Sequence, residues 1–380
     1  MKVLIAIDSM KGSLSTFAAG RAAEEGVRLA YPDAETLVSP LADGGEGTVS
    51  AIVAGAGGVT EHITVTGPLG DPVEAEYGIL PETKTAVIEM AAAAGITLVS
   101  ENKRNPLKTT TYGVGEIILD AIERHGCRRF IIGIGGSATN DGGAGMLSAL
   151  GVSFRTADGT PIARGAEGLA SLASIDTSGL HPALAECDFN IACDVTNPLC
   201  GDMGCSAVYG PQKGATPEMI RTMDASLERY AELTAMATGI HAKDAAGAGA
   251  AGGLGFAFLS YLHGSLVSGI TLVMDVTGLD EKIQNADLVI TGEGRLDGQS
   301  CMGKAPVGVA RLAKKYAKPV IAFAGCVTPD APLVNDHGID AFFPILPAPM
   351  TLAEAMDEKN AYTNMKNTVC QALRLVKAVT

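Results

Sequence analysis

Two glycine-rich loops near the start of the sequence combine acids, a cation and hydroxyl groups. The loop DSMKGSLS follows a short apolar run and contains Asp8, Ser9 and Lys11. The loop LADGGEGT places Asp43 and Glu46 around its glycines, so it could support a metal ion or hold a substrate hydroxyl. Asp and Ser also cap helices, and Asp-Gly-Gly is also an ordinary turn. We favour a functional role for the first loop because α/β proteins bind ligands beyond the ends of strands.

A third segment, GIGGSATNDGGAG at residues 133–145, links a probable strand to a probable helix. Glycine lets backbone N–H groups converge on an anion, and the positive end of a helix adds to this attraction. The segment therefore predicts a phosphate or carboxylate cradle, in preference to tight helix–sheet packing alone. Its candidate nucleotide-binding residues are Gly135, Gly136, Ser137, Thr139 and Asn140.

Two further segments in the middle of the chain carry isolated polar candidates. In ACDVTNPLCG, Asp194 ends a probable strand and Asn197 follows it. Carboxylate and amide oxygens suit Mg²⁺ or can orient a hydroxyl, although an Asx turn would use the same residues. In GPQKGA, Lys213 could bind a substrate anion or lie on a solvated surface turn.

The segment TGEGRLDGQSCMGKAPVGVA combines the largest number of candidate groups. Its G-x₄-G-K sequence is one residue short of a P-loop, because Ala305 stands where Ser or Thr would hold Mg²⁺. Lys304 still begins a probable helix, where a cation and the helix terminus can hold a phosphate together. Arg295 could grip a carboxylate through two parallel hydrogen bonds, which Lys could not do as well.

Two other enzyme signatures are incomplete in this chain. GAGAAGGLGF invites comparison with ribokinase-type sugar kinases, but Ala250 stands at the position of their catalytic Asp. A nicotinamide dehydrogenase would need G-x-G-x-x-G after the first strand, where this chain has Lys11-Gly12. Neither mechanism is therefore expected.

The elements that must position these groups follow from the apolar pattern. Val3–Ile7 predicts a buried strand of a parallel sheet, and the next segment predicts a helix that ends near Ala30. The same strand and helix pattern returns late in the chain. The expected late elements are strands at 288–291, 320–324 and 341–346 and helices at 305–317 and from about 352.

The middle of the chain has a different pattern. Short strands at 62–66, 73–80 and 86–90 are separated by turn signals, which favours antiparallel pairing, and strands at 130–134 and 189–193 then alternate with helices. We therefore expect an α/β protein with a discontinuous Rossmann-like parallel-sheet domain and an inserted mixed α/β domain. The expected boundaries are 1–66 with 286–380 for the first domain and 67–285 for the second, with the active site in the interdomain cleft.

The composition excludes several classes of protein. The 380 residues are 47% apolar and carry a formal charge of −14, which disfavours nucleic acid and anionic membranes as partners. The 8 cysteines form no C-x-x-C pair, and no signal-peptide core begins the chain, so we expect a cytoplasmic protein with reduced thiols. Residues 245–274 lack charge, but their many glycines favour a buried turn and helix over a membrane span.

Seven of these segments, taken in order, resemble the type-1 glycerate kinase family. They are DSMKGSLS, LADGGEGT, GGSATNDGG, CDVTNPLCG, GPQKGA, GAGAAGGLG and TGEGRLDGQS with GKAPVGVA. The resemblance runs from the first strand to about residue 310 and continues less distinctively to the C-terminus. It implies a two-domain glycerate 2-kinase that uses ATP and Mg²⁺ to convert D-glycerate to 2-phospho-D-glycerate, in glyoxylate and sugar-diacid catabolism.

The resemblance does not assign roles to the side chains, so these come from the chemistry of phosphoryl transfer. That chemistry needs positioned phosphates, neutralised charge and an acceptor oxygen held in line. We expect Lys11, Lys304 and the 133–145 loop to hold phosphates, and Arg295 or Lys213 to bind the glycerate carboxylate. The candidates are Asp194, Asp43, Lys11 and Asp297 for catalysis, Arg295, Lys213, Ser9 and Asn197 for substrate binding, and Asp194, Asp8 and Glu293 for the metal.

Two alternatives remain open from the sequence. The enzyme could phosphorylate the 3-hydroxyl or another small hydroxy acid. Less favoured is a non-catalytic protein that binds a small acid in a cleft. We expect glycerate and ATP as small-molecule partners, with a homodimer as the alternative to a monomer.

Overall fold

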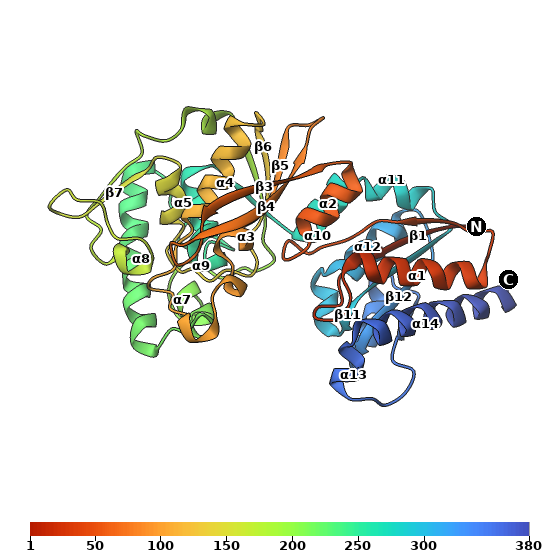
Figure 1. The fold of residues 1–380 in the computed structure, drawn as a ribbon. Coiled ribbons are helices and arrows are strands. Elements are labelled where there is room, and N and C mark those ends of the chain that lie inside the picture. Colours follow the sequence, from red (N-terminus) through yellow and green to blue (C-terminus); the bar gives the residue numbers. More distant parts are fainter. Residues whose placement is uncertain (380) are drawn as a thin grey trace. The chain divides into compact units, whose positions relative to one another are not determined.

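The computed structural model describes residues 1–379 and has the mixed α/β architecture that the sequence predicts (Figure 1). The chain folds into two compact units. The first unit comprises Met1–Asp43, Ser50–Gly57 and Ile270–Thr380, and the second comprises Gly44–Val49 and Gly58–Gly269. The first unit is discontinuous, as the host of an inserted domain must be. The second unit is interrupted as well, because Ser50–Gly57 belongs to the first unit.

The first unit is built on a five-stranded sheet whose strand order is β13-β12-β11-β1-β2. Every neighbouring pair is parallel, which requires helical connections and confirms the Rossmann-like expectation. Strand β1 is buried from Val3 to Ile7, as a continuous apolar run in a parallel sheet predicts. The strands are β1 (Lys2–Ile7), β2 (Glu35–Val38), β11 (Leu288–Leu296), β12 (Val320–Val327) and β13 (Ala341–Pro344).

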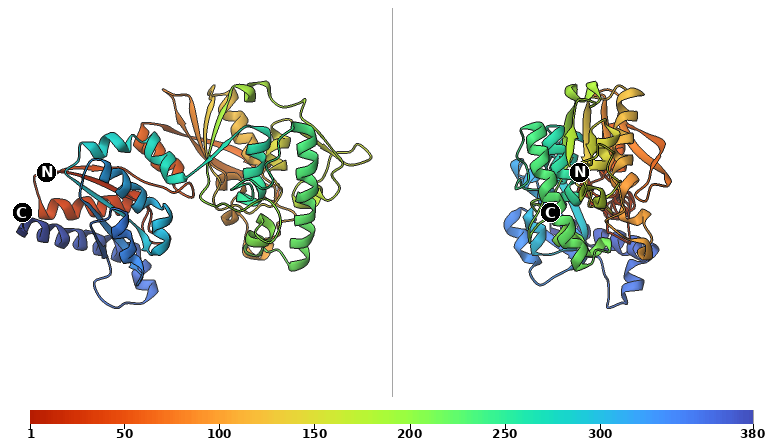
Figure 2. Two further views of the ribbon diagram at one scale, coloured as in Figure 1. Left: turned by 180° about the vertical axis from the view of Figure 1, so that it is seen from behind. Right: turned by 90° about the vertical axis from the view of Figure 1, so that its left-hand side faces the viewer.

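Helices α1 and α14 lie side by side along the first unit, in both Figure 1 and the views of Figure 2. The Ser15 hydroxyl caps α1 by accepting from the N–H of Ala18 at 3.2 Å. Gly26 is required at the crossing, because a Cβ there would lie 2.5 Å from the Lys366 carbonyl oxygen of α14. The helices wholly or mostly in this unit are α1 (Thr16–Ala30), α2 (Thr48–Ala56), α10 (Gly269–Val276), α11 (Leu279–Gln284), α12 (Ala305–Lys315), α13 (Leu352–Met356) and α14 (Glu358–Val379).

The second unit is built on a six-stranded sheet of order β10-β9-β6-β5-β4-β3. Strands β3, β4 and β5 pair antiparallel, as their turn signals predict, whereas β5, β6, β9 and β10 pair parallel. The sheet strands are β3 (Val59–Thr66), β4 (Pro72–Leu80), β5 (Thr85–Glu89), β6 (Arg129–Gly133), β9 (Asp188–Ala192) and β10 (Ser265–Val267), and a separate hairpin contains β7 (Ser153–Arg155) and β8 (Ser174–Asp176).

Helices and one large apolar core complete the second unit. Within that core the rings of Phe130 on β6 and Phe189 on β9 stack at a centroid distance of 4.8 Å. The helices are α3 (Ala91–Ala94), α4 (Tyr112–Glu123), α5 (Ala144–Ala149), α6 (Ala166–Leu169), α7 (Cys205–Tyr209), α8 (Pro217–Thr238) and α9 (Ala250–Tyr261). The 3₁₀ helices of the chain are η1 (Ile96–Leu98), η2 (Glu101–Lys103), η3 (Pro182–Glu186), η4 (Pro211–Lys213), η5 (Gly298–Met302) and η6 (Ala331–His337).

The boundaries between the units differ from those expected from the sequence. Strand β3 pairs along its whole length with β4, so the second unit begins at Gly58 and not at residue 67. Helices α10 and α11 fold with the first unit, so its last segment begins at Ile270 and not at residue 286. A short piece, Gly44–Val49, also belongs to the second unit, where the Gly44 carbonyl packs against Gly133.

Two local elements also differ from or refine the expectation. Strand β11 continues through the Gly-Glu-Gly-Arg sequence to Leu296, so Glu293 and Arg295 lie on a strand and not on a loop. Helix α9 begins with a kink, because Ala251, Gly252 and Gly253 all have positive φ. Among the described residues, no helix is both long and apolar enough to cross a membrane.

Candidate active site

Two buried acids lie side by side in the first unit, where Asp8 directly follows β1 and Glu293 lies on the neighbouring strand β11. The β1–β11 register pairs Ile7 with Gly292, so the next residues, Asp8 and Glu293, follow at the same edge. Asp8 is 7% exposed and Glu293 is 8% exposed. Burial, together with the nearby carboxylate of Asp43, raises the pKa of Asp8 to about 7. Burial also raises the pKa of Glu293. A cation bound beside these two acids would therefore stabilise their charged forms.

Lys11 is the cation of this cluster. Its Nζ lies 3.0 Å from Oδ2 of Asp43, and the lysine side chain is 75% exposed. Partial burial lowers the pKa of Lys11, but the carboxylates of Asp43, Asp8 and Glu293 outweigh this effect and raise it. Lys11 therefore stays charged and can reach a ligand. The Ser9 N–H donates to Oδ1 of Asp8 at 2.7 Å and fixes the direction of that carboxylate.

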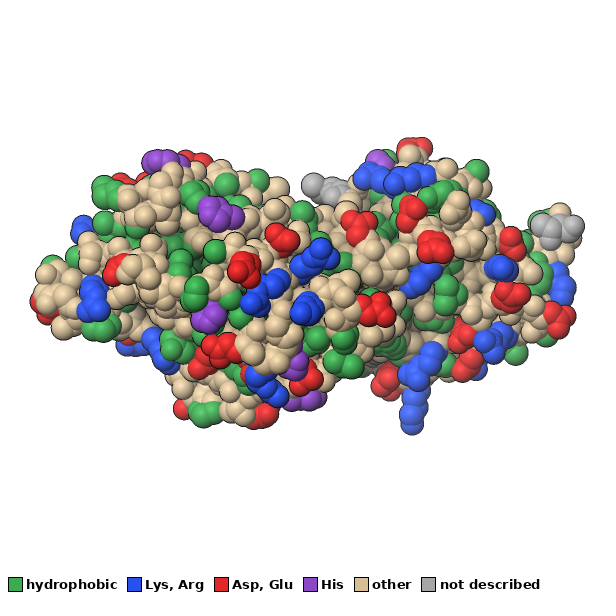
Figure 3. All heavy atoms as spheres, turned by 90° about the horizontal axis from the view of Figure 1, so that it is seen from above, with side chains coloured by type: hydrophobic (Ala, Val, Ile, Leu, Met, Phe, Trp, Pro, Cys, Tyr) green, Lys and Arg blue, Asp and Glu red, His purple; other side chains and the backbone are tan. Residues whose placement is uncertain are grey.

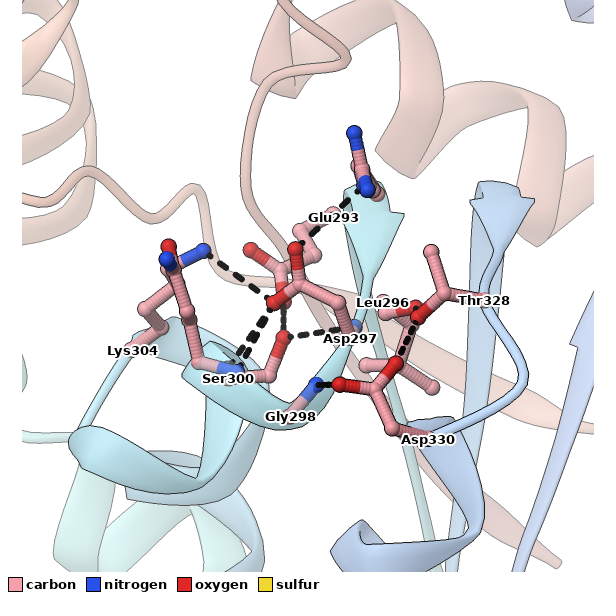
Figure 4. Close-up of polar contacts among 10 residues, drawn as sticks. Glu293, Leu296, Asp297, Gly298, Ser300, Lys304, Thr328 and Asp330 are labelled. Atoms are coloured by element: carbon pink, nitrogen blue, oxygen red, sulfur yellow. Dashed lines mark hydrogen bonds and ion pairs between the residues drawn. The ribbon is translucent and has the colours of Figure 1, made fainter.

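A hydrogen-bonded corner at the end of β11 organises the next group of residues (Figure 4). Asp297 accepts from the N–H groups of Gln299 and Ser300 at 3.0 and 3.2 Å and so caps η5. The buried Ser300 hydroxyl accepts from the Asp297 N–H and donates to Oε1 of Glu293. The Asp330 carboxylate accepts from the N–H of Gly298 at 3.0 Å. The corner thus links the cap residue to the buried acid.

Asp297 also holds the two cations that the sequence singled out. Its Oδ2 lies 3.3 Å from Nε of Arg295, and its Oδ1 lies 3.6 Å from Nζ of Lys304. The Arg295 side chain is 66% exposed, so its guanidinium can exchange this partner for a ligand. Both oxygens of Asp297 already have partners, so this carboxylate is better placed to hold the two cations than to accept a proton.

The glycine-rich loop after β6 presents backbone donors in the second unit. Within residues 1–379, the N–H groups of Gly135, Gly136 and Ser137 donate to no other group of the chain. Gly135 and Gly136 are exposed, and Gly136 has φ of +72°, which only glycine adopts without strain. The Gly136 carbonyl accepts from the N–H of Ile96 at 2.8 Å, which holds the loop against the segment after α3. These free N–H groups are available as donors to an anion.

Lys213 lies beneath this loop and not on the surface. It is 2% exposed, and its Nζ donates to the Ser137 hydroxyl at 2.8 Å and to the Thr139 carbonyl at 2.6 Å. Burial lowers the pKa of Lys213 to about 8. Thr139 and Asn140 are also fully buried, and the Asn140 amide donates to the Ser206 hydroxyl at 2.9 Å. These three residues therefore support the loop from the interior.

The two candidates in the segment after β9, Asp194 and Asn197, differ in exposure and in their contacts. Asp194 is exposed at the end of the strand, and its Oδ1 accepts from the N–H of Gly269 at 3.2 Å. Strand β9 pairs with β6 up to Ala192 and Gly133, so Asp194 lies at the same sheet edge as the glycine-rich loop. Asn197, in contrast, donates to the Met203 carbonyl and accepts from the Tyr209 hydroxyl, so both ends of its amide brace the segment.

Comparison with known proteins gives the family of the chain that carries these loops. The model of the family described as "Glycerate kinase family" matches residues 3–377. The chain belongs to the glycerate kinase family. It is 51% identical to "Glycerate 2-kinase" of Escherichia coli (strain K12), and the alignment covers 100% of this chain and 97% of the relative. It is 47% identical to "Glycerate kinase" of Bacillus subtilis (strain 168), with coverage of 100% and 99%.

A solved structure agrees with this assignment. The crystal structure of a protein assigned as glycerate kinase 2 from Salmonella typhimurium LT2 is similar with a TM-score of 0.90 and 50% sequence identity. The similarity covers 100% of this chain and 98% of that one. This member of the glycerate kinase family is therefore an enzyme with the two-domain α/β fold that its loop sequences predicted.

The glycerate kinase loops bring the candidates together in two sets, one in each unit. The first-unit set is Asp8, Ser9, Lys11, Asp43, Glu293, Arg295, Asp297 and Lys304, and the second-unit set is Gly135, Gly136, Ser137, Asp194 and Lys213, with Thr139, Asn140 and Asn197 as internal supports. In the part of the chain that the structure describes, no three His, Cys, Asp or Glu side chains form a group that could hold a metal by themselves.

Sequence reasoning missed a buried acid that shapes the glycerate kinase loop. Asp141 is fully buried and accepts from the N–H and hydroxyl of Thr111 and from the N–H groups of Gly143 and Gly145. Burial raises the pKa of Asp141. The acid ties the starts of α4 and α5 together and uses the N–H groups of the second half of the loop. Only the first half is therefore available to a ligand.

Ser300 and Asp330 were also missed. Both support Asp297 or its neighbours through hydrogen bonds across the β11–η5 corner. The cap sequence Asp-x-x-Ser at 297–300 was the available signal, because a residue three positions after a cap often completes a capping box.

Proposed function

We propose that the protein transfers the γ-phosphoryl group of ATP to the 2-hydroxyl of D-glycerate. The observation that carries this proposal is the 51% identity, over the full chain, to a relative named Glycerate 2-kinase. The site geometry supports phosphoryl transfer, because free backbone donors follow β6 in the second unit, and exposed cations and acids lie on and after β1 and β11 in the first.

Phosphate groups have two kinds of candidate contact. The N–H groups of Gly135, Gly136 and Ser137 suit an anion through geometry, since they point to no internal acceptor within residues 1–379. Lys11 and Lys304 suit an anion through charge, since both are exposed enough to leave their carboxylate partners. We assign the nucleotide phosphates to these groups.

The glycerate carboxylate is assigned to Arg295. A guanidinium can bind both oxygens of a carboxylate through two parallel hydrogen bonds. Arg295 is the better of the two expected candidates because it is exposed, whereas Lys213 is buried and already donates twice. In this assignment Asp297 keeps the guanidinium near the position in which it binds substrate.

The acceptor hydroxyl is assigned to Asp194, as orienting group or general base. Asp194 is exposed at the end of β9. Asp43 is the second choice because it pairs with Lys11 at 3.0 Å, and Asp297 is the third because cations and N–H groups engage it. A carboxylate at hydrogen-bonding distance from the hydroxyl would take its proton as the bond to phosphorus forms.

The buried pair Asp8 and Glu293 fits Mg²⁺. Both offer hard oxygen ligands on neighbouring strands β1 and β11, and burial raises the pKa of both, so a bound cation would stabilise their charged forms. Mg²⁺ usually takes one or two carboxylates and completes its shell with phosphates and water, so a group of three acids is unnecessary. When bound, the ion would neutralise charge on the transferring phosphoryl group. Asp194 is the alternative ligand.

A panel assay tests the proposal. ADP formation would be measured with ATP, Mg²⁺ and a series of small hydroxy acids, and ³¹P NMR would identify the product. We expect D-glycerate to be the preferred acceptor and 2-phosphoglycerate to be the product. A 3-phosphoglycerate product would show that the 3-hydroxyl is phosphorylated instead of the 2-hydroxyl. Tight glycerate binding with no ADP formation would favour a non-catalytic binding protein.

A further inference from the structure

The buried Lys213 contacts Ser137, which has the most exposed side chain in the glycine-rich loop at residues 133–145, here called the donor loop. Its Nζ is 2.8 Å from Oγ of Ser137 and 2.6 Å from the Thr139 carbonyl oxygen. At 2% exposure, the ammonium group cannot contact a ligand in this conformation. Any effect of Lys213 on a bound ligand must therefore be transmitted through a neighbour such as Ser137.

The chemistry of the two groups determines which of them donates. A charged lysine has three N–H donors and no acceptor, so the Ser137 oxygen must accept the hydrogen bond. The single proton of the Ser137 hydroxyl must then point elsewhere. Among residues 1–379, that proton has no acceptor, and the serine keeps 7% of its surface exposed beside the free N–H groups of Gly135 and Gly136.

We propose that Lys213 is a positioning residue, which makes the Ser137 hydroxyl a donor to a phosphate oxygen bound by the loop. The proposal rests on the function proposed above and deepens it. The loop then offers a phosphate three N–H groups and one oriented O–H, with the lysine charge one layer below. Preorganised donors of this kind are most effective where water is excluded.

Deprotonation of Lys213 would reverse the arrangement. A neutral amine accepts a hydrogen bond, so the Ser137 proton could turn inward and be lost to the ligand. The pKa of Lys213 is lowered to about 8 by burial, while the thiol of Cys205 and the carboxylate of Asp141 act in the opposite direction. The switch therefore falls just above neutral pH.

The test compares Lys213→Met, Ser137→Ala and the double variant, with Lys243→Met as a matched control. Lys243 belongs to the same unit but pairs with Glu228 at the surface. Steady-state rates would be measured with varied ATP and varied D-glycerate from pH 6.5 to 9.5. Chemical unfolding curves would establish that each variant is folded.

We expect both single variants to lose about 10- to 100-fold in kcat/KM for ATP, the range for one lost hydrogen bond to a charged group. The double variant should have a kcat/KM for ATP no lower than that of the less active single variant, because both changes remove the same donor. The wild type should lose kcat/KM above pH 8, and this loss should be absent from Lys213→Met and Ser137→Ala. Lys243→Met should behave as the wild type.

Several results would overturn the inference. If the effects of the two single variants multiplied in the double variant, Lys213 would not act through Ser137. If Lys213→Met raised KM for glycerate and left that for ATP unchanged, the lysine would belong to the carboxylate site. An unaltered Lys213→Met enzyme would remove any positioning role.

Binding of ADP, measured by calorimetry, separates this inference from the function. A wild type that transfers no phosphate to glycerate would refute the proposed function. Even then, weaker ADP binding by both Lys213→Met and Ser137→Ala would sustain the inference, and equal ADP binding by all variants would refute it.

Discussion

Asp194 is the residue whose chemistry is most directly testable, because it is exposed at the end of β9 while its strand neighbours are buried. Asp194→Asn keeps the shape of the side chain and removes its ability to accept a proton. We expect kcat to fall about 10²- to 10⁴-fold, the usual contribution of a general base, with little change in stability. The measurement is kcat with saturating ATP and glycerate.

Asp188→Asn is the matched control for Asp194, because it makes the same change at the other, exposed end of the same strand. It should leave kcat unchanged. A near-normal kcat and pH profile for Asp194→Asn would move the role to Asp43.

Arg295 allows a test of substrate binding at the same scale. Arg295→Lys keeps the positive charge but loses the two-pronged contact with a carboxylate. We expect KM for glycerate to rise about tenfold or more while KM for ATP changes little, since one charge-assisted hydrogen bond is lost. Arg129→Lys, at the exposed start of β6, is the control. A larger rise in KM for ATP would assign Arg295 to the nucleotide.

At the scale of elements, the donor loop depends on the kinked start of α9. The Gly142 N–H donates to the Gly252 carbonyl at 2.9 Å, and a Cβ on Gly252 would lie 2.0 Å from the Thr139 carbonyl oxygen. That carbonyl is also an acceptor for Lys213. The loop, the kink and the buried lysine are therefore in direct contact with one another.

Gly252→Ala tests this coupling between α9 and the loop. We expect a loss of stability well above the ~1 kcal/mol that a positive φ alone costs, together with a raised KM for ATP. The control is Gly239→Ala, which also has positive φ, of +76°, but has open space around its Cβ position. Equal unfolding free energies for the two variants in urea would show that the close contact is unimportant.

At the scale of the whole molecule, charge is arranged locally and not as a broad field. The chain carries −14, and acidic and basic side chains are interspersed on the face drawn in Figure 3. Recognition of two anionic substrates is therefore assigned to a few placed cations and backbone N–H groups. The low fraction of charged residues, 18%, is consistent with that arrangement.

The stability of the whole molecule should depend on the buried charge of Lys213. Its pKa is lowered from 10.5 to about 8 by burial, so between these values the unfolded chain binds more protons than the folded one. The folded state therefore gains stability as pH rises through this window. Relative to Lys213→Met, the wild type should gain about 2 to 3 kcal/mol between pH 7.5 and 10, on the scale of 1.36 kcal/mol per unit of pKa shift.

Urea unfolding of both proteins at several pH values measures this gain. Because other alkaline groups titrate in both proteins, the difference between them isolates the lysine. A constant difference across the range would mean that Lys213 keeps an ordinary pKa and that its alkaline switch is absent.

Local patterns in the sequence were sufficient for much of the fold and for locating the loops that carry the candidate residues. The buried run Val3–Ile7, the helix that follows it and the late strand and helix units each show, in their own residues, the apolar pattern of the element that they form. The glycine-rich loops were also identified, because glycine lets backbone N–H groups converge on an anion. Asp8, Lys11 and Ser137 thus lie at strand ends as expected.

The tertiary structure alone decided the features that depend on distant partners. Strand β3 belongs to the second unit because its pairing partner is β4, and β11 extends through Glu293 and Arg295 because β12 pairs with it to Leu296. The short sequence around Lys213 is typical of a surface turn. The residue can nevertheless be buried, because Ser137 and Thr139 accept hydrogen bonds from its ammonium group. Sequence spacing shows which groups are present, but burial and hydrogen-bond direction determine which of them can meet a ligand.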